Sequence, residues 1–381
     1  MMQFRRLGRT EVKVGIIGLG TEYIWHEPRE VVAEVVLEAI DNGINYMDVF
    51  MGSPDVRDNI GSVLKKRREE VLIAGHLGCY DIDGQYAKTR DVKISEYFLN
   101  DFYKRLRTDY TDILFLHHID EDFELEEAFS TGGILDLALR LQKQGKARFI
   151  GFSSHKVPAS FKALCSGYID VFMYPVNPSF DALPGNINHE EITEEERSNT
   201  KAVAHDTSDR TSLYLECMQR DIGLVAMKPY ASGRLFSLSK SVTATVTPIQ
   251  CLSYALSRPG VSTVVPGCKN AYEVRAALEY LDASNEEKDH SSLIKNLDLN
   301  LSGQCMYCNH CQPCPEGIDI AAVTRLVDAS RDGLTDIINK QYRHLKRKAS
   351  DCKKCKTCEE RCPFDVTAAE NMERALKVFG D

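Results

Sequence analysis

Residues 29–50 read REVVAEVVLEAIDNGINYMDVF and join a helical pattern to a strand-like one. In the first half, apolar side chains recur at the spacing of one helix face; they are Val31, Val32, Val35, Val36 and Ala39. Gly43 follows as a helix stop. Residues 44–50 then form a short apolar run interrupted by Asp48. The stretch predicts a helix followed by a strand with a polar residue near its end.

The same alternation continues along most of the chain. Eight short apolar runs are candidate strands: residues 14–21, 44–50, 71–77, 111–119, 148–153, 171–176, 223–229 and 262–266. Amphipathic stretches such as ISEYFLNDFYKRLRT and GGILDLALRLQKQG lie between them. Eight strand–helix units in roughly 270 residues match a (β/α)8 TIM barrel. We expect this barrel over residues 1–285, with a doubly wound sheet as the alternative.

Two segments depart from this rhythm. Residues 181–212 are polar and acidic, without apolar periodicity, and are too long for an ordinary loop. Because they follow the sixth expected strand, they would lie over the C-terminal mouth of the barrel, as a lid, a partner surface or a solvated loop. After Leu281 a polar linker leads to residues 303–381, where we expect a small helical domain held by metal.

Composition excludes several classes of protein. The net charge of −9 argues against a nucleic-acid partner. The sequence shows neither a signal peptide nor an apolar run long enough to span a membrane. Thirteen cysteines without a secretory signal indicate thiolate ligands in a reducing compartment, so we expect a cytoplasmic protein.

Eight of the cysteines lie in two runs, QCMYCNHCQPCPEG and DCKKCKTCEERCPF. Closely spaced cysteines followed by a proline are typical of two-cluster ferredoxins, in which the fourth cysteine of each run binds the other cluster. We therefore expect two [4Fe–4S] clusters and a ferredoxin-like domain. The first cluster would be held by Cys305, Cys308, Cys311 and Cys362, and the second by Cys352, Cys355, Cys358 and Cys314. Two zinc sites are the alternative, although zinc usually joins two cysteine pairs across a longer insert.

A basic stretch, RHLKRKASDCKKCK, surrounds the second run. These cations could offset the negative charge of a thiolate-bound cluster. Alternatively, they could dock an acidic electron donor such as a ferredoxin or a flavodoxin.

Polar side chains end several expected strands on the side where barrel enzymes bind their substrates. These residues are Asp48, His76, His117, His118, Ser153, Ser154 and His155. An aspartate and imidazoles suit proton transfer near neutral pH. Metal binding is the alternative.

The motifs RRLGRTEVKVGIIGLGT, INYMDVF, LFLHHID, KARFIGFSSH and GLVAMKPYASGRL resemble the landmarks of the aldo-keto reductase family. With the cysteine tail, the chain resembles the branch that carries a ferredoxin-like domain. The resemblance implies a barrel that binds NAD(P)H and reduces a carbonyl group with an Asp–Tyr–Lys–His tetrad.

The tetrad implied by the resemblance is altered in this chain. Its Asp and His correspond to Asp48 and His117, but its Tyr falls on Ser53 and its Lys on His76. A serine hydroxyl is a far weaker acid than a phenol. We expect the catalytic residues to be Asp48, His76, His117 and Ser53.

The implied cofactor positions have changed as well. Met173 falls where a Gln would contact the nicotinamide, and Glu273 falls where an Arg would meet the 2′-phosphate. A thioether cannot replace an amide. The residues left to bind the cofactor are Ser153, Ser154, Lys269 and Arg275.

We therefore expect an iron–sulfur oxidoreductase that reduces or oxidises a small organic substrate in the barrel mouth. Electrons would pass one at a time through the two clusters, without NAD(P)H. One alternative is an NAD(P)H-dependent carbonyl reductase with His76 as the replacement acid. Another is a non-catalytic module that passes electrons between partners.

Overall fold

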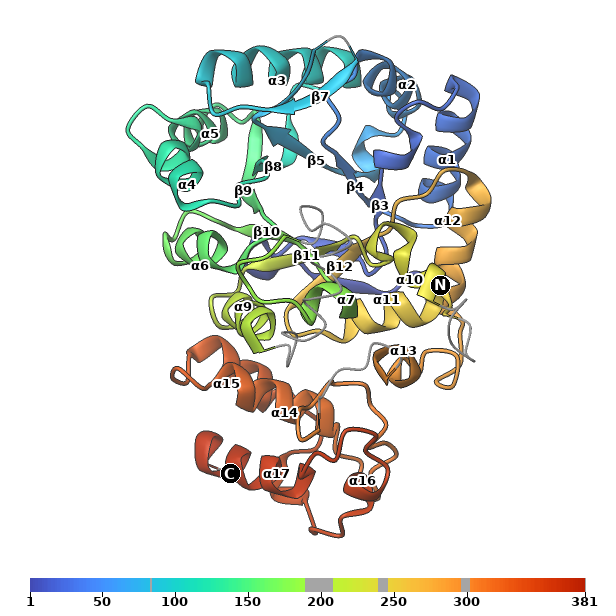
Figure 1. The fold of residues 1–381 in the computed structure, drawn as a ribbon, viewed down its shortest axis with the longest axis vertical. Helices are drawn as coiled ribbons and strands as arrows, with labels where there is room; N and C mark the ends of the chain where they lie inside the picture. The colour runs from blue at the N-terminus through green and yellow to red at the C-terminus, as the bar shows by residue number, and fades with distance from the viewer. Residues whose placement is uncertain (83, 189–207, 239–245, 296–301, 381) are drawn as a thin grey trace.

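The computed structural model describes residues 1–82, 84–188, 208–238, 246–295 and 302–380 (Figure 1). Its centre is an eight-stranded sheet in which each hydrogen-bonded pair of neighbours is parallel. The strands, in their order around the sheet, are β3 (Leu19–Gly20), β4 (Tyr46–Val49), β5 (Leu72–Leu77), β8 (Thr111–Leu116), β9 (Ala147–Ser153), β10 (Val171–Pro175), β11 (Gly223–Met227) and β12 (Val261–Val265). Parallel bridges between Ile17 and Val264 and between Gly20 and Gly267 close the sheet into a barrel. The (β/α)8 expectation is confirmed, and the doubly wound alternative is wrong.

Helices surround the barrel and bury one face each against it (Figure 1). They include α1 (Arg29–Asp41), α2 (Pro54–Leu64), α3 (Val92–Leu106), α5 (Ile134–Lys143), α6 (Val157–Cys165), α9 (Ser208–Gln219), α11 (Pro248–Ser257) and α12 (Ala271–Leu278). Three further helices of the barrel region are α4 (Asp122–Phe129), α7 (Pro178–Asp181) and α10 (Arg234–Leu238). In α1, Val32, Val35 and Val36 are fully buried, as their helical spacing predicts. A second apolar cluster, which includes Tyr46, Phe115 and Val225, fills the barrel interior.

The first expected strand, residues 14–21, is divided in the structure. β2 (Lys13–Gly15) pairs antiparallel with β1 (Phe4–Arg6), and only β3 joins the barrel sheet. Leu7 and Val14 belong to the interior cluster of the barrel. The apolar run was therefore longer than the barrel strand because its first part belongs to a separate hairpin.

A second hairpin, absent from the sequence-based prediction, follows β5. β6 (Cys79–Ile82) pairs antiparallel with β7 (Gln85–Lys88). Its base is fixed by a hydrogen bond from Cys79 Sγ to the Phe50 carbonyl, 2.8 Å long, and by an ion pair between Lys88 and Glu124 at 3.1 Å. The hairpin also lies directly on Gly52, where an added Cβ would be 2.6 Å from the Asp81 backbone nitrogen. Only glycine allows this close approach.

The expected polar insertion, residues 181–212, is described at its two ends only. Residues 189–207 lie outside the described residues. At its start, Asn188 Nδ2 donates to Asp120 Oδ2 at 3.1 Å. At its end, α9 begins at Ser208, so the last residues of the expected loop are helical.

The C-terminal region is helical and packs against the barrel (Figure 1). It contains α14 (Ile320–Ala329), α15 (Asp336–Arg343), α16 (Thr357–Glu360) and α17 (Ala368–Phe379), and α13 (Ser291–Lys295) precedes it. Leu215 and Met218 of α9 share one apolar cluster with Val323 and Val327 of α14. Within the described ranges, every helix is too short or too polar to cross a membrane.

Candidate active site and cysteine sites

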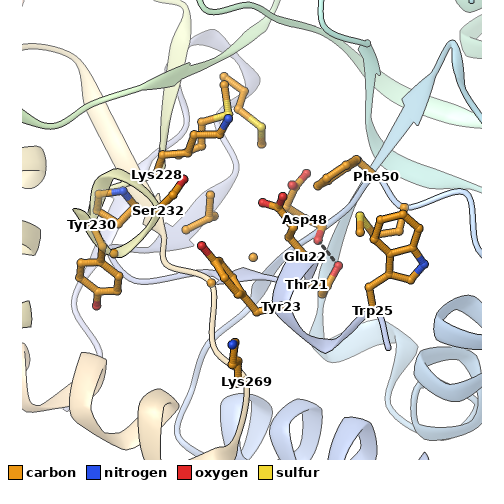
Figure 2. Close-up of a pocket in the computed structure, with 18 of the residues that line it drawn as sticks. Thr21, Glu22, Tyr23, Trp25, Asp48, Phe50, Lys228, Tyr230, Ser232 and Lys269 are labelled. Atoms are coloured by element: carbon orange, nitrogen blue, oxygen red, sulfur yellow. Dashed lines mark hydrogen bonds between the residues drawn. The ribbon is translucent and has the colours of Figure 1, made fainter. Parts of the chain in front are cut away.

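A cavity of about 660 Å³ opens at the C-terminal ends of the barrel strands. Strand ends supply much of its wall, including Asp48, His76, His117, Ser153, Met173 and Lys228. Figure 2 shows Asp48 in the middle of the site, with Lys228 and Tyr230 on one side and Phe50 and Trp25 on the other. This size and position suit a small-molecule site.

Three of the four expected catalytic residues form one hydrogen-bonded chain. His76 Nε2 lies 2.8 Å from Asp48 Oδ1, and His76 Nδ1 lies 2.8 Å from His117 Nδ1. All three side chains are buried. β4 and β5 are neighbouring strands and His117 directly follows β8, so the barrel register brings these side chains together. These hydrogen bonds provide a path along which a proton can move between the Asp48 carboxylate and the His117 imidazole.

The outer end of this chain reaches a residue that sequence reasoning missed. Tyr86, on the hairpin strand β7, places its hydroxyl 2.7 Å from His117 Nε2. Its ring also meets the Phe50 ring edge-on, with centroids 5.9 Å apart. Tyr86 lines the cavity and is 36% exposed. We call Asp48, His76, His117 and Tyr86 the Asp48 group.

A signal for this hairpin was present in the sequence. The dipeptide Asp83–Gly84 separates two short runs, residues 79–82 and 85–88, and Asp–Gly is a favoured turn between antiparallel strands. The contact between Tyr86 and His117 depends on how the hairpin folds over the barrel mouth, which the turn signal does not determine.

His117 is held rigidly and stays neutral. Its carbonyl accepts a hydrogen bond from Arg90 Nη1 at 2.9 Å, and its backbone nitrogen donates to the Leu77 carbonyl at 3.0 Å. Burial, together with the nearby His76 and His118, holds the pKa of His117 well below its usual value. At neutral pH the ring therefore carries one hydrogen, on either nitrogen.

Three expected site residues are directed away from the cavity. Ser53 precedes α2 as its N-cap residue, without a capping hydrogen bond from its side chain, and Ser154 is fully buried with its hydroxyl 3.0 Å from Asp120 Oδ1. Arg275 pairs with Glu38 of α1 at 2.8 Å. Among the described residues, these three do not belong to the cavity wall. Position along the sequence placed them near the site, but local hydrogen bonds and helix phase turn them away.

The end of the cavity near α12 combines one cation with one anion. Lys269 and Glu273 both line it, and the Lys269 backbone nitrogen donates to the Glu273 carboxylate at 2.8 Å. The Tyr23 ring lies against Gly267, where an added Cβ would be 2.1 Å from a ring carbon. Figure 2 shows Tyr23 and Lys269 on this side of the site. A negative phosphate placed here would lie beside a carboxylate.

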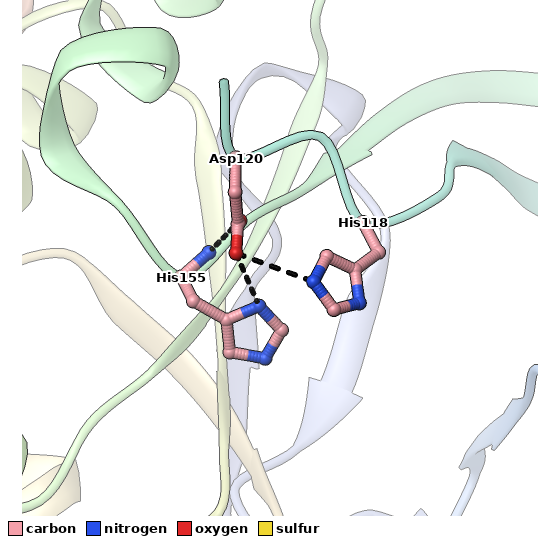
Figure 3. Close-up of side chains that lie close together, drawn as sticks. All are labelled: His118, Asp120 and His155. Atoms are coloured by element: carbon pink, nitrogen blue, oxygen red, sulfur yellow. Dashed lines mark hydrogen bonds and ion pairs between the residues drawn. The ribbon is translucent and has the colours of Figure 1, made fainter. Parts of the chain in front are cut away.

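A second histidine group lies next to the first. His118 Nε2 and His155 Nδ1 are 3.2 and 3.4 Å from Asp120 Oδ2 (Figure 3). Lys228 Nζ lies 3.1 Å from His155 Nε2. We call His118, Asp120, His155 and Lys228 the Asp120 group. His118 has a φ of 46°, in the left-handed region, which accompanies the divergence of two consecutive histidines into different groups.

The Asp120 group has the donor set of a metal site, but its hydrogen bonding favours another role. An ammonium group can only donate, so Lys228 makes His155 Nε2 an acceptor. His155 Nδ1, which lies 3.4 Å from Asp120 Oδ2, then carries the hydrogen and has no lone pair for a metal. Burial, then Lys228, lowers the pKa of His155 to about 4 despite the nearby carboxylate. The geometry therefore favours a fixed charge network.

Asp120 is the centre of that network. Its Oδ1 accepts from the His155 backbone nitrogen at 2.6 Å and from Ser154 Oγ at 3.0 Å, and its Oδ2 accepts from Asn188. Burial alone would raise the pKa of Asp120, but hydrogen bonds from His118 and His155 outweigh it and hold this pKa well below its usual value.

The structure brings cysteines of the two runs together in the tail. Cys314 of the first run and Cys352, Cys355 and Cys358 of the second line one small cavity of about 20 Å³. Cys305, Cys308 and Cys362 pack around a separate apolar cluster that includes Tyr254, Met306 and Phe364. Cys311 packs against the neighbouring cluster that also contacts Cys314.

Comparisons with known proteins match the barrel. A model described as "Aldo/keto reductase family" matches residues 11–298. The L-glyceraldehyde 3-phosphate reductase of Escherichia coli K12 is 30% identical over 168 residues, which are 40% of this chain and 46% of that protein. The chain thus spans about half the length of the curated relatives that it matches.

Solved structures share the fold at low sequence identity. The holo form of aldo-keto reductase AKR11C1 from Bacillus halodurans aligns with a TM-score of 0.58 and 19% identity, covering 78% of this chain and 96% of that one. A putative aldo-keto reductase from Pseudomonas aeruginosa aligns with a TM-score of 0.53 and 22% identity, covering 73% and 95%. The family match extends over most of the chain, including each barrel strand. This chain belongs to the aldo/keto reductase family of oxidoreductases.

Proposed function

We propose that this chain is an iron–sulfur oxidoreductase that converts a small organic substrate in the barrel cavity without NAD(P)H. Electrons would arrive one at a time through two [4Fe–4S] clusters in the tail. The observation that carries the proposal is the convergence of Cys314 with Cys352, Cys355 and Cys358 around one small cavity. Cysteines far apart in the sequence thus meet in the grouping that the crossed ferredoxin pattern predicts.

The residues of the tail fit such clusters chemically. Thiolates are the ligands of iron–sulfur clusters. Cys305, Cys308 and Cys362 pack against one apolar cluster, and Cys311, Cys314, Cys352 and Cys358 pack against another, while Cys355 is exposed. Cys305, Cys308, Cys311 and Cys362 would hold the first cluster. When bound, the clusters would supply single electrons.

Packed side chains connect the first cysteine group to the cavity. Tyr254 of α11 contacts this group, and its hydroxyl donates to Asp181 Oδ2 at 2.7 Å. Tyr214 donates to the other oxygen of Asp181 at 2.6 Å, and its ring lies 6.1 Å from that of Tyr174. The Tyr174 hydroxyl donates to the carbonyl of His155 in the cavity wall. The first cysteine group therefore has a continuous contact path to the substrate site.

The second cysteine group faces solvent among lysines. Cys355 is exposed, and so are its neighbours Lys353, Lys354 and Lys356. Although Lys354 is paired with Glu373, this surface remains cationic. It suits an acidic one-electron donor such as a ferredoxin or flavodoxin, which would approach the outer cluster first.

The cavity fits a nicotinamide dinucleotide poorly. Aldo-keto reductases usually use NADPH, whose 2′-phosphate needs cations. Here Glu273 adds an anion beside Lys269, and Arg275 pairs with Glu38 instead. Met173 lines the wall with a thioether that cannot replace an amide contact.

The second candidate is an NADPH-dependent carbonyl reductase, with His76 as the replacement acid and the clusters as an electron outlet. The family assignment and the glyceraldehyde-phosphate reductase relative favour it. Lys269 on the cavity wall is the cation available for a phosphate.

An anaerobic titration of the cluster-loaded protein separates the two candidates. We expect a reduced ferredoxin to bleach cluster absorbance near 400 nm, whereas NADH and NADPH leave it unchanged. Trp25, the single tryptophan of the chain, lines the cavity, so its emission reports nucleotide binding independently. Rapid bleaching by NADPH, with quenching of Trp25, would support the second candidate instead.

The cluster ligands are tested by iron analysis. Cys355→Ser should remove about half of the bound iron, because it opens one of two clusters. Cys165→Ser is the matched control, since Cys165 is an exposed cysteine of the barrel. Equal iron content in both variants, or stoichiometric zinc in the purified protein, would contradict the proposed clusters.

A further inference from the structure

We propose that Tyr86 delivers protons to the substrate and that Asp48, His76 and His117 form the relay that supplies it. This inference rests on the proposed reduction in the cavity, but it does not depend on where the electrons come from. Tyr86, on the hairpin strand β7, would take the role of the family tyrosine, whose position in this chain is Ser53.

The geometry joins the four side chains into one line of hydrogen bonds. Asp48 Oδ1, both nitrogens of His76, both nitrogens of His117 and the Tyr86 hydroxyl follow one another at 2.8, 2.8 and 2.7 Å. The inner three residues are buried, whereas Tyr86 is one-third exposed and lines the cavity. All four side chains line the cavity, so the line runs along its wall from the buried Asp48 to Tyr86, its most exposed member.

We call the line unloaded when it holds no proton to deliver. In this state, the hydrogen of each bond is donated in the direction of Asp48. His76 Nε2–H donates to the Asp48 carboxylate, and His117 Nδ1–H donates to His76 Nδ1. The Tyr86 hydroxyl donates to His117 Nε2. Both imidazoles are neutral, and the only charge is the carboxylate of Asp48.

In the loaded state, the line holds one additional proton. His76 then carries hydrogens on both nitrogens, and its positive charge lies 2.8 Å from Asp48. His76 Nδ1–H donates to His117 Nδ1, and His117 Nε2–H donates to the Tyr86 oxygen. The Tyr86 hydroxyl hydrogen is then no longer donated to His117 and becomes the one that passes to a substrate oxygen.

Delivery converts the loaded state into the unloaded one. As the substrate oxygen takes the Tyr86 hydrogen, Tyr86 takes one from His117 Nε2, and His117 Nδ1 takes one from His76 Nδ1. Reduction of a carbonyl to an alcohol consumes two electrons and two protons. Each delivery supplies one proton. With a one-electron donor such as reduced ferredoxin supplying both electrons, one proton goes to the substrate oxygen and one to its carbon, so water reloads the relay twice in each turnover.

The surroundings suit these roles. Because its pKa is held well below the usual value, His117 stays neutral in both states and only carries the hydrogen. The hairpin holds Tyr86 in place through Cys79, Lys88 and the close contact on Gly52. Among the described residues of the cavity wall, Tyr86 is the one whose hydroxyl bonds to His117.

Two variants of the full, cluster-loaded chain test the inference. Tyr86→Phe removes the phenolic hydroxyl and keeps the ring. Tyr80→Phe makes the same change on β6 of the same hairpin, where the ring packs on Phe98 with centroids 5.6 Å apart. DL-glyceraldehyde serves as the carbonyl probe, with reduced ferredoxin and NADPH as separate electron donors. We expect Tyr86→Phe to lower kcat about 100-fold or more with KM changed less than about threefold, and Tyr80→Phe to stay within about twofold of the wild type.

The second readout needs no turnover. In ¹⁵N spectra of histidine-labelled protein, Tyr86→Phe should shift the Nε2 signal of His117, because that nitrogen loses its donor, whereas Tyr80→Phe should leave it in place. His117→Asn assigns the signal. An unmoved His117 signal, or equal kcat in the two tyrosine variants, would overturn the inference. If only NADPH supports turnover, the ferredoxin-based function fails, and the same tyrosine comparison is then made with NADPH.

Discussion

The Asp48 group and the Asp120 group share one barrel mouth and nearly the same residue types, yet they are built for different tasks. The carboxylate of Asp120 accepts from a backbone amide, a serine hydroxyl and Asn188 in addition to its histidines. Among the described residues, the side-chain hydrogen bond of the Asp48 carboxylate is the one with His76. A carboxylate with several fixed donors holds its charge permanently, whereas one that faces a single imidazole can balance a proton that comes and goes.

Replacing each aspartate with asparagine should give the largest effects and tests the contrast between the two groups most directly. Asp48→Asn should lower kcat about 1000-fold, because the relay loses the anion that balances a charged His76. Its free energy of unfolding should fall by only about 1 kcal/mol, since the amide still offers a hydrogen bond to His76. Steady-state kinetics and chemical denaturation of the same preparation give both values.

Asp120→Asn should show the opposite pattern. We expect the free energy of unfolding to fall by about 4 kcal/mol, because the change removes one member of a buried charge network. The kcat of the folded fraction should stay within about tenfold of the wild type. A large loss of kcat without a loss of stability would mean that the Asp120 group, too, moves protons.

The pH dependence of the free energy of unfolding tests the same contrast. Burial lowers the folded-state pKa of His155 to about 4, while the unfolded chain titrates near 6.5. The unfolded state therefore binds a proton first, and stability is lost as the pH falls from about 6.5 to about 4, by about 3 kcal/mol in total from this residue. Above about pH 6.5 its contribution is constant.

His117 and His290 also have lowered pKa values, so the wild-type curve alone does not isolate His155. Denaturant unfolding of wild type and His155→Gln is therefore compared at pH 7 and pH 4.5. The wild type should lose more stability between these values than the variant does. Equal losses would show that His155 is charged in the folded protein.

The smallest expected effect comes from the loop beneath the hairpin. In Gly52→Ala the new Cβ would lie 2.6 Å from the Asp81 nitrogen, so the hairpin must shift and Tyr86 moves relative to His117. We expect kcat to fall about tenfold, equivalent to about 1.4 kcal/mol of barrier. Gln85→Ala is the control, because Gln85 is an exposed residue of β7 in the same hairpin. Similar kcat values in the two variants would contradict the dependence of Tyr86 on the Gly52 contact.

Sequence reasoning predicted the barrel because its eight units repeat a local pattern of apolar spacing. It also placed Asp48, His76 and His117 correctly at strand ends, since parallel strands carry their ends to one mouth. It failed where a side chain's direction depends on local bonding: Ser154 turns to Asp120, and Arg275 turns to Glu38.

The contacts of Tyr86 and Asp120 could not be predicted from the sequence for a related reason. Tyr86 lies on a hairpin that folds back over the mouth, and its partner His117 is 31 residues away. Asp120 lies in the quoted LFLHHID motif, but its partners Ser154, His155 and Asn188 come from other loops. Neither relationship leaves a periodic trace in the sequence.

Arg258, at the end of α11, links the two parts of the chain in a way that bears on how the protein matures. It is almost fully buried, lies over the rings of Tyr254 and Tyr307, and donates to the carbonyl of Met306, next to Cys305. If the tail were unfolded for want of iron, this guanidinium would lose Met306 and Tyr307 and keep only Tyr254 and the Ser257 hydroxyl, both of the barrel, among these contacts. If the proposed clusters are what keeps the tail folded, iron supply would also bear on the stability of the barrel at Arg258, and chains without clusters would be the ones removed by proteolysis.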